Sequence, residues 1–194
     1  FLQNEWKNDR WGILIGGRLD KHNMVDNVIF SPRANLRFNP TQNINLRLSY
    51  SSGFRAPQAF DEDMHIENVG GTVAMIERAK NLKEEKSQSF SASADMYHRF
   101  GVFQTNFLIE GFYTRLTDVF VLGEPYDRGD GILVKTRSNG PGAKVMGLTL
   151  EGKVAYLSIL QIQAGLTLQR SRYDEPHKWH DDAPAEKKIF RTPD

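Results

Sequence analysis

The sequence has 194 residues, which suits one domain or a segment of a larger one. Its 25 basic and 24 acidic side chains nearly cancel, which excludes the strongly basic surface that nucleic acid or an anionic membrane surface would attract. The absence of cysteine excludes disulfide scaffolds and thiolate metal sites.

Apolar and polar residues alternate strictly along most of the chain. In "LQIQAGLTLQ", for example, Leu160, Ile162 and Leu166 share one face, while Gln161 and Gln163 share the other. A period of two residues is typical of half-buried β-strands and leaves little room for helices. The sequence therefore predicts an all-β protein with strands at about 1–7, 11–19, 29–38, 43–53, 86–97, 102–118, 143–155, 159–172 and 188–194.

The connections between these strands alternate between short and long without exception. They run through the short Asn8–Arg10, Asn39–Gln42, His98–Gly101 and Leu157–Ser158 and the long Asp20–Val28, Phe54–Glu85, Val119–Gly142 and Tyr173–Lys187. In an antiparallel up-and-down meander, this places every tight turn at one end of the sheet and every long loop at the other. Outer-membrane barrels have this arrangement, whereas soluble sandwiches mix loop lengths at both ends.

Strand length and aromatic residues point the same way. Several predicted strands reach about ten residues, where globular strands usually have five or six. Aromatic side chains gather beside the short turns (Trp6, Trp11, Phe38, Tyr97, Phe100, Phe103 and Tyr156) and nearer the long loops (Phe30, Tyr50, Phe90 and Tyr113). Two aromatic belts are expected of a membrane-spanning barrel, although strand-end aromatics also cap ordinary cores.

In a barrel, the apolar face of each strand would contact lipid, and the polar face would line a hydrated interior. The polar face carries Arg33, Arg37, Asn45, Arg47, Asp95, Asn106 and Glu110. The same residues would also suit the solvated side of an ordinary antiparallel sheet. A chain that begins and ends within such a pattern is expected to be a fragment of a longer protein.

The longest connection, Phe54–Glu85, is a candidate functional loop because loops of more than about 12–15 residues are usually functional or disordered. It holds Asp61, Glu62, Asp63, His65 and Glu67, which could ligate a divalent cation or form a solvated acidic surface. The spacing matches no known cation loop, so no metal site is assigned. Further along this connection, "AMIERAKNLKEEK" is compatible with one or two helical turns.

A second polar cluster, "EPHKWHDD", offers His177, His180, Asp181 and Asp182, but the flanking Pro176 and Pro184 indicate a loop without fixed metal geometry. No cofactor is predicted. The sequence contains no Gly-x-Ser-x-Gly, Walker or HExxH motif, and no carboxylate is placed with a catalytic partner. An enzyme is therefore not expected, although some outer-membrane barrels are proteases or lipases.

Three stretches resemble motifs of the TonB-dependent outer-membrane receptors. "GFRAP" (residues 53–57) is similar to the family's strand-to-loop signature at the outer rim of the barrel. "NLKEEKS" (81–87) resembles its Asn-Leu-Lys-Pro-Glu-x-Ser element, with Glu84 in place of proline. "GLTLE" (147–151) resembles its Gly-hydrophobic-Glu-hydrophobic-Glu strand, with Thr149 in place of the first glutamate. The three motifs occur in the family's order.

The resemblance implies a 22-stranded barrel in the bacterial outer membrane, plugged by an N-terminal domain and driven through TonB. Residues 1–194 would supply about nine of these strands, without the plug, the TonB box or the remaining strands. Such receptors import scarce nutrients, for example iron–siderophore complexes or corrinoids, but the motifs do not identify the ligand. The predicted ligand-facing residues are Arg55, Gln58, Asp61, Asp63 and His65, and the loops with Tyr126, Arg128 and Trp179 could contribute equally. Arg55 could instead be a rim arginine hydrogen-bonded to loop carbonyls.

Nine strands of a large barrel leave two unpaired edges, which lipid does not tolerate. We therefore expect an isolated fragment to self-associate through its sheet edges or to aggregate. The alternative is a soluble secreted β-sandwich that binds a ligand and whose apolar faces pack on each other.

Overall fold

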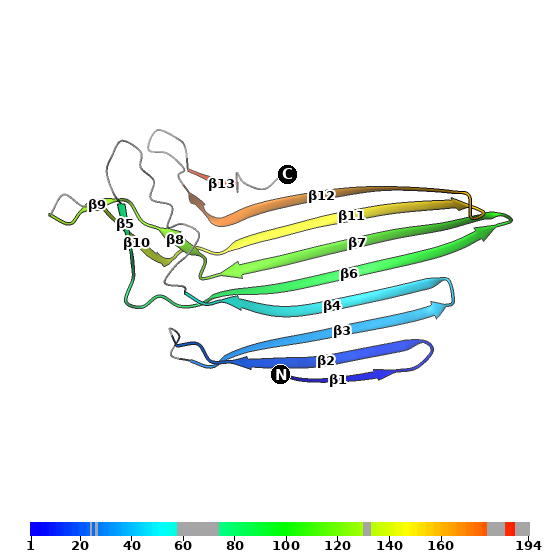
Figure 1. Cartoon of the computed structure of the whole chain (residues 1–194), viewed down its shortest axis with the longest axis horizontal. Coiled ribbons are helices and arrows are strands. Elements are labelled where there is room, and N and C mark those ends of the chain that lie inside the picture. The colour runs from blue at the N-terminus through cyan, green and yellow to red at the C-terminus, as the bar shows by residue number, and fades with distance from the viewer. Residues whose placement is uncertain (24, 26, 58–73, 130–132, 178–184, 189–194) are drawn as a thin grey trace.

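The computed structural model describes the whole chain except residues 24, 26, 58–73, 130–132, 178–184 and 189–194. Its main element is a nine-stranded antiparallel sheet in which each strand pairs with the next one along the meander (Figure 1). The strands are β1 (Leu2–Lys7), β2 (Trp11–Asp20), β3 (Ile29–Thr41), β4 (Ile44–Arg55), β6 (Glu85–Phe100), β7 (Phe103–Thr117), β11 (Ala143–Tyr156), β12 (Leu160–His177) and β13 (Glu186–Lys188). The predicted all-β, up-and-down architecture is confirmed.

The strand boundaries agree closely with the alternation in the sequence. β12 is the main extension, because it continues to His177, beyond the predicted end at residue 172. The last predicted strand begins slightly earlier than expected, and β13 pairs with β12 through Lys188 opposite Arg172 and Glu186 opposite His177. The rest of that predicted strand lies outside the described residues.

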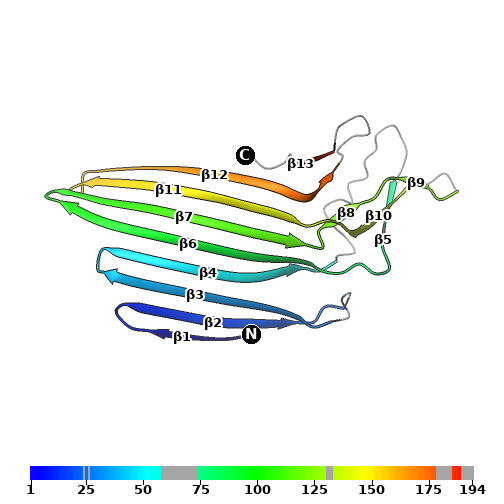
Figure 2. The ribbon, with the colours of Figure 1, turned by 180° about the vertical axis from the view of Figure 1, so that it is seen from behind.

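All tight turns lie at one end of the large sheet, and the long connections leave from the other (Figures 1 and 2). Two of the tight turns show why they close in so few residues. The side chain of Asn8 accepts hydrogen bonds from the backbone N–H groups of Arg10 and Trp11, at 2.9 and 2.7 Å. Between β6 and β7, Gly101 has a φ of 57°, a conformation that glycine adopts without a steric penalty.

A second, four-stranded sheet lies beyond the long-loop end of the first (Figure 1). It contains β5 (Ala74–Arg78), β8 (Phe120–Leu122), β9 (Tyr126–Asp127) and β10 (Leu133–Asn139). β10 is central, since it runs parallel to β5 and antiparallel to β8 and β9. The two longest connections of the meander are therefore joined to each other by backbone hydrogen bonds.

The prediction of helical turns in "AMIERAKNLKEEK" is wrong. Ala74–Arg78 is a strand that pairs with β10 from Ala74 opposite Leu133 to Arg78 opposite Arg137. The pairing continues past the strand, because the Ala79 N–H donates to the Arg137 carbonyl at 2.8 Å. The partner strand comes from a loop more than fifty residues away, and this long-range pairing outweighs the local helical preference.

The apolar side chains of the large sheet form continuous rows on one face. One row is set by direct pairing across seven strands, through Ile13, Leu36, Leu48, Ala92, Gly111, Leu148 and Leu168. Most residues of this row are exposed, with Leu48 at 55% and Leu168 at 58%, whereas Leu36 and Gly111 are half-buried. In the described part of the chain, the buried hydrophobic residues are only Val25, Ile29, Val134 and Ala143.

A soluble β-sandwich would cover this apolar face with a second sheet. Figures 1 and 2 show one layer of long strands, and the small sheet lies beyond the strand ends. An exposed apolar face of this extent is typical of a surface that contacts lipid or a partner. The soluble sandwich is therefore not favoured. The described residues include no helix that is long and apolar enough to cross a membrane.

Aromatic side chains mark both ends of the apolar face. Beside the tight turns, the rings of Trp11 and Phe38 stack with centroids 4.2 Å apart. Toward the long-loop end, Tyr50 and Phe90 lie 4.8 Å apart, and Tyr113 is paired with Phe90 on the next strand. These positions agree with the two predicted belts.

Candidate functional site at the long-loop end

Arg55 ends β4 at the base of the longest connection, where it joins three elements. Its Nε lies 3.0 Å from Oε2 of Glu85, the first residue of β6. Its guanidinium lies over the ring of Phe120 in β8, 5.1 Å from the ring centroid. The other oxygen of Glu85 accepts a hydrogen bond from the Phe120 N–H at 2.5 Å. Arg55 and Glu85 therefore fix β8 to the rim of the large sheet.

Asn139, the last residue of β10, connects two segments that lie far apart in the sequence. Its side-chain oxygen accepts a hydrogen bond from the Lys83 N–H at 2.7 Å. Its amide nitrogen donates to the carbonyls of Lys83 and Asp118, at 3.0 and 2.8 Å. One side chain thus holds the entry of β6, the exit of β7 and the end of β10 together.

Glu84, which stands where the motif that this stretch resembles has proline, is buried immediately before β6 and forms an ion pair with Lys86 at 3.0 Å. Burial alone would raise the pKa of this carboxyl, but a backbone hydrogen bond and the neighbouring Lys86 ammonium outweigh burial and lower the pKa below its usual value. Glu84 therefore supplies an electrostatic anchor at the point where proline would have stiffened the chain.

The small sheet brings several cations to one of its faces. Arg78 and Arg137 are paired residues of the parallel strands β5 and β10, so their side chains leave the sheet on the same side. Lys135 lies two residues before Arg137 and shares that side. The opposite side carries Val134, which is fully buried, and Glu77, which lies 3.6 Å from Arg128. Arg137 is only 4% exposed, whereas Arg78 is exposed and Lys135 is half-buried, so Arg78 and Lys135 are the cations of this face that solvent reaches.

Only part of the predicted ligand-facing set lies in the described part of the chain. Arg55 occupies the anchoring position above, with the Glu85 carboxylate as one of its partners, and its ligand contact stays a prediction. Tyr126 lies in β9 of the small sheet, Arg128 directly follows that strand, and both are exposed. Gln58, Asp61, Asp63, His65 and Trp179 fall outside the described residues, so their ligand contacts stay predictions.

Most residues of the candidate metal clusters lie in the same gaps, and His177 is the last residue of β12. The acidic group from Asp61 to Glu67 is outside the described residues, as are His180, Asp181 and Asp182. In the described remainder of the chain, no group of three or more His, Asp or Glu side chains is placed to hold a metal ion.

Sequence reasoning missed the small sheet and with it Asn139, Arg137 and Lys135. A signal was available in "GILVKTRSN", where a β-favouring Ile-Leu-Val run stands beside a β-branched threonine. The short length of β8 and β9 gave no comparable signal.

The polar face of the large sheet carries a hydrogen-bonded network toward the tight-turn end. The amide nitrogen of Asn45 donates to Asn39 at 2.6 Å, and Nε of Arg47 donates to Asn45 at 2.6 Å. On the next strand, Asp95 accepts from the Tyr97 hydroxyl at 2.7 Å and from the Asn106 amide. Such a network is compatible with a hydrated barrel interior.

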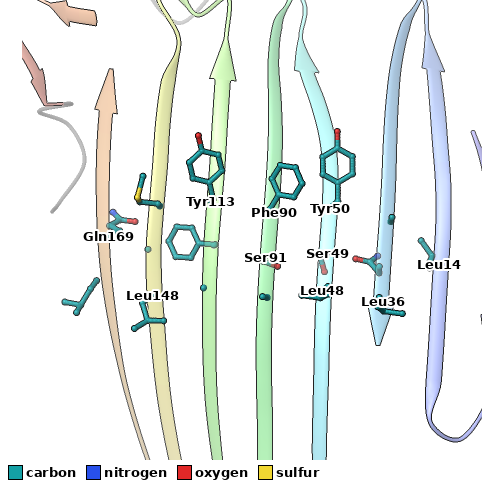
Figure 3. Close-up of a pocket in the computed structure, with 18 of the residues that line it drawn as sticks. Leu14, Leu36, Leu48, Ser49, Tyr50, Phe90, Ser91, Tyr113, Leu148 and Gln169 are labelled. Carbon is teal, nitrogen blue, oxygen red and sulfur yellow. The ribbon is translucent and has the colours of Figure 1, made fainter. Parts of the chain in front are cut away.

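The opposite face contains an open apolar hollow of about 1130 Å³. Figure 3 shows the rings of Tyr50, Phe90 and Tyr113 side by side at its upper end, with Leu36, Leu48 and Leu148 below them. The apolar face, the polar face and the one-sided loops together describe the wall of a membrane barrel.

A family model for the β-barrel of TonB-dependent receptor-like proteins matches residues 1–194. The chain belongs to the TonB-dependent receptor family. No curated protein matches the chain. Among solved structures, the siderophore receptor PirA from Pseudomonas aeruginosa is similar, with 18% identity and a TM-score of 0.72, covering 89% of this chain and 34% of that one.

Two other solved structures also share this fold. The FrpB iron transporter from Neisseria meningitidis has 18% identity and a TM-score of 0.63, covering 88% of this chain and 25% of that chain. The alcaligin outer-membrane receptor FauA from Bordetella pertussis has 18% identity and a TM-score of 0.53. The match covers 88% of this chain and 29% of the FauA chain. This TonB-dependent receptor chain thus spans a quarter to a third of the length of these structures.

Proposed function

We propose that residues 1–194 are part of the barrel domain of a bacterial outer-membrane transporter, whose plug and remaining strands belong to the rest of the protein. The transporter binds a scarce nutrient at the long-loop end and imports it into the periplasm with energy delivered through TonB. The observation that carries this proposal is the sheet itself, with an apolar face for lipid, a polar face for the lumen and all long loops at one end.

The charge of the small sheet favours an anionic nutrient complex. The exposed Arg78 and the half-buried Lys135 share one face above the rim with the buried Arg137, and an anionic chelate that reaches Arg78 and Lys135 would gain electrostatic attraction there. Iron–siderophore complexes are often anionic, and the similar solved proteins are described as an iron transporter, a siderophore receptor and an alcaligin receptor. A corrinoid or another chelate remains within the same proposal.

The first experiment measures uptake of a panel of radiolabelled ferric siderophores and cobalamin in cells that carry or lack the receptor gene. We expect uptake of at least one compound that requires both the receptor and TonB. Loss of the TonB requirement, or the absence of uptake across the panel together with normal surface display, would contradict the proposed function.

A second experiment tests the cationic face. Substituting Arg78→Gln and Lys135→Gln together should weaken binding of the transported anion by about tenfold, since the two charges together contribute on the order of 1.4 kcal/mol. Lys80→Gln is the matched control, because Lys80 is exposed in the turn after β5. Equal affinities of the double variant and the control would assign recognition to other loop residues.

A further inference from the structure

Two arginines on the polar face of the large sheet lie over glycines of the neighbouring strand. Arg37 in β3 is paired with Gly12 in β2, where a Cβ would fall 3.3 Å from Nε of Arg37. Arg33, four residues earlier, is paired with Gly16, where a Cβ would fall 3.4 Å from Nε of Arg33. The glycines thus leave the space in which each guanidinium lies against the sheet. Four residues span about 13 Å along a strand, so the same construction occurs twice along this wall.

Arg37 belongs to a pocket nearer the tight turns, which we call the inner pocket. The inner pocket has a volume of about 300 Å³, and its polar lining residues are Glu5, Asn35, Arg37, Arg47 and Ser49. Arg37 is directly opposite Arg47 in β4, and like charges at such positions repel each other. In the described part of the chain, Nε of Arg37 is buried without a hydrogen-bond partner, and neither arginine forms an ion pair with a carboxylate. An external anion would therefore be attracted to both guanidinium groups.

Arg33 belongs to a second pocket nearer the long-loop end, which we call the outer pocket. It has a volume of about 400 Å³, and its polar lining residues are Arg18, Ser31, Arg33, Ser51 and Ser52. Arg18 is neutralised by Asp20, with 2.6 Å between Nε and Oδ2, whereas the exposed Arg33 forms no ion pair with a described carboxylate. Oγ of Ser31, a residue that is 8% exposed, has no hydrogen-bond partner among the described residues. Buried polar atoms normally have a partner, so each pocket lacks one that a ligand can supply.

The acidic residues of the polar face leave this wall positive. Asp95 in β6 already accepts two side-chain hydrogen bonds from its neighbours. Glu5 lines the inner pocket and offsets one of its two positive charges. Lys7 lies in the same row as Arg37, because both are paired with Gly12, and it adds a further positive charge. The wall formed by β1–β4 therefore keeps a net positive charge at this level of the polar face.

We propose that the outer and inner pockets are successive binding sites for the anionic nutrient complex, whose path through the barrel follows β2, β3 and β4. In each pocket, a guanidinium binds carboxylate or phenolate oxygens of the complex through paired hydrogen bonds. Pores that conduct anions are lined by arginine or lysine, and conduction needs several weak sites instead of one tight site. A permanent ion pair with another part of the receptor would need a single site, whereas this construction is repeated. The inference rests on the proposed function and adds the wall along which the nutrient moves.

The first test measures the charge preference of the inner pocket in the intact receptor, purified in detergent. Residues 1–194 contain no cysteine, so Ser49→Cys places the only thiol of this segment at the pocket wall. Its reaction rates with an anionic and a cationic methanethiosulfonate reagent are each divided by the rate with a free thiol, and the receptor without this substitution gives the background. The anionic reagent should react at least about tenfold faster, since a cleft lined by one sign of charge concentrates ions of the opposite sign.

Adding Arg37→Gln and Arg47→Gln should lower the ratio of the two rates by about tenfold, because the charges that concentrate the anion are removed. The matched control, Arg99→Gln with Lys153→Gln, removes two cations of β6 and β11 at the tight-turn end. Its ratio should stay within about twofold, since charges more than about 10 Å away are largely screened by salt. A ratio near unity without these substitutions, or equal ratios in the two double variants, would overturn the proposal. A thiol that neither reagent reaches until the plug is removed would also overturn it, by assigning the arginines to a contact with the plug.

The second test separates a site on the transport path from a passive charge. Radiolabelled ferric tris-catecholate and ferric hydroxycarboxylate complexes are the anionic probes, measured in cells with Ser49 intact. For a transported probe, the Arg37→Gln and Arg47→Gln double variant should lower the maximal uptake rate at least about fivefold, because an intermediate site is weakened. The dissociation constant at the surface of TonB-deficient cells should stay unchanged, since the rim is not altered.

Heat-modifiable electrophoretic mobility reports whether each variant is folded. The single variant Arg47→Gln, at an exposed residue, replaces the double variant if that one fails to fold. A preserved charge preference without any TonB-dependent uptake would contradict only the proposed function. TonB-dependent uptake at an unchanged maximal rate in the folded variant would contradict only this inference.

Discussion

At the residue scale, the contact between Arg55, Glu85 and Phe120 explains how a long loop keeps a defined base. Replacing Glu85 with alanine should remove the acceptor of the Phe120 N–H and one partner of Arg55. We expect hydrogen exchange in residues 120–122 to accelerate by about tenfold, the size expected when one charge-assisted hydrogen bond is lost. Glu124→Ala is the control because Glu124 is exposed. Unchanged exchange in the Glu85 variant would show that β8 is held by its pairing with β10 alone.

Gly147 gives a second prediction at this scale. The ring of Phe112 lies across its backbone, and a Cβ on residue 147 would fall 2.5 Å from that ring and 2.6 Å from the Leu168 carbonyl. Gly147→Ala should therefore lower the free energy of unfolding by about 1–3 kcal/mol. Gly152→Ala in the same strand is the control, because a Cβ there meets nothing within 4 Å. Urea unfolding of the receptor in detergent measures the free energy of unfolding of both variants. Equal values for Gly147→Ala and Gly152→Ala would contradict the steric explanation.

The buried Glu84 leads to a prediction about pH. Its pKa is lowered below the usual 4.5, so its contribution to stability is complete above pH 4.5 and is lost as the pH falls through the lower value of the folded state. At neutral pH, Glu84→Gln should weaken the protection of the backbone amides before β6 against hydrogen exchange. At a pH below the pKa of Glu84 in the folded state, the substitution should have no effect. Hydrogen exchange of residues 81–86 across this range measures the difference. A difference that persists at the lowest pH would show that the shape of the side chain matters and its charge does not.

At the scale of elements, the small sheet depends on Asn139. The Asn139 side chain is hydrogen-bonded to three backbone groups, which are the N–H and carbonyl of Lys83 and the carbonyl of Asp118. Asn139→Ala should leave these three groups without that partner. We expect limited proteolysis between residues 118 and 142 to be faster by about tenfold, since an unsatisfied backbone group costs about 1–3 kcal/mol. Ser138→Ala, on the opposite side of β10, serves as the control. If both variants were cleaved at the native rate, the backbone pairing of β10 would be sufficient on its own.

The elements also show what the sequence could and could not predict. The long strands were predictable because one face of the sheet needs apolar side chains and the other needs polar ones. Apolar and polar residues therefore alternate along each strand, as Leu166 and Gln163 show in β12. The small sheet was not, since β5 gains its partner from a loop distant in sequence, and its apolar residues Met75 and Ile76 also suit a helical turn. Arg55 was predictable as a rim residue, but its pairing with Glu85 depended on the register between β4 and β6.

At the scale of the whole molecule, the described sheet is the wall of a barrel rather than a closed unit. Within the described residues, β1 and β13 each pair with one neighbour, so each leaves an edge available for pairing. The isolated segment should therefore form oligomers or aggregates without detergent and a β-rich species with it. Light scattering in both conditions tests this, and a detergent-independent monomer would contradict it.

The central claim is that alternate residues of the long strands face lipid. The most direct measurement places single tryptophans along β12 of the intact receptor, in a background with Trp6, Trp11 and Trp179 replaced by phenylalanine, and reconstitutes each variant in vesicles with brominated acyl chains. The claim predicts strong fluorescence quenching at Ile162, Ala164, Leu166 and Leu168 and weak quenching at Gln161, Gln163, Gly165 and Thr167. Quenching without this alternation would contradict the assignment of the apolar face to lipid.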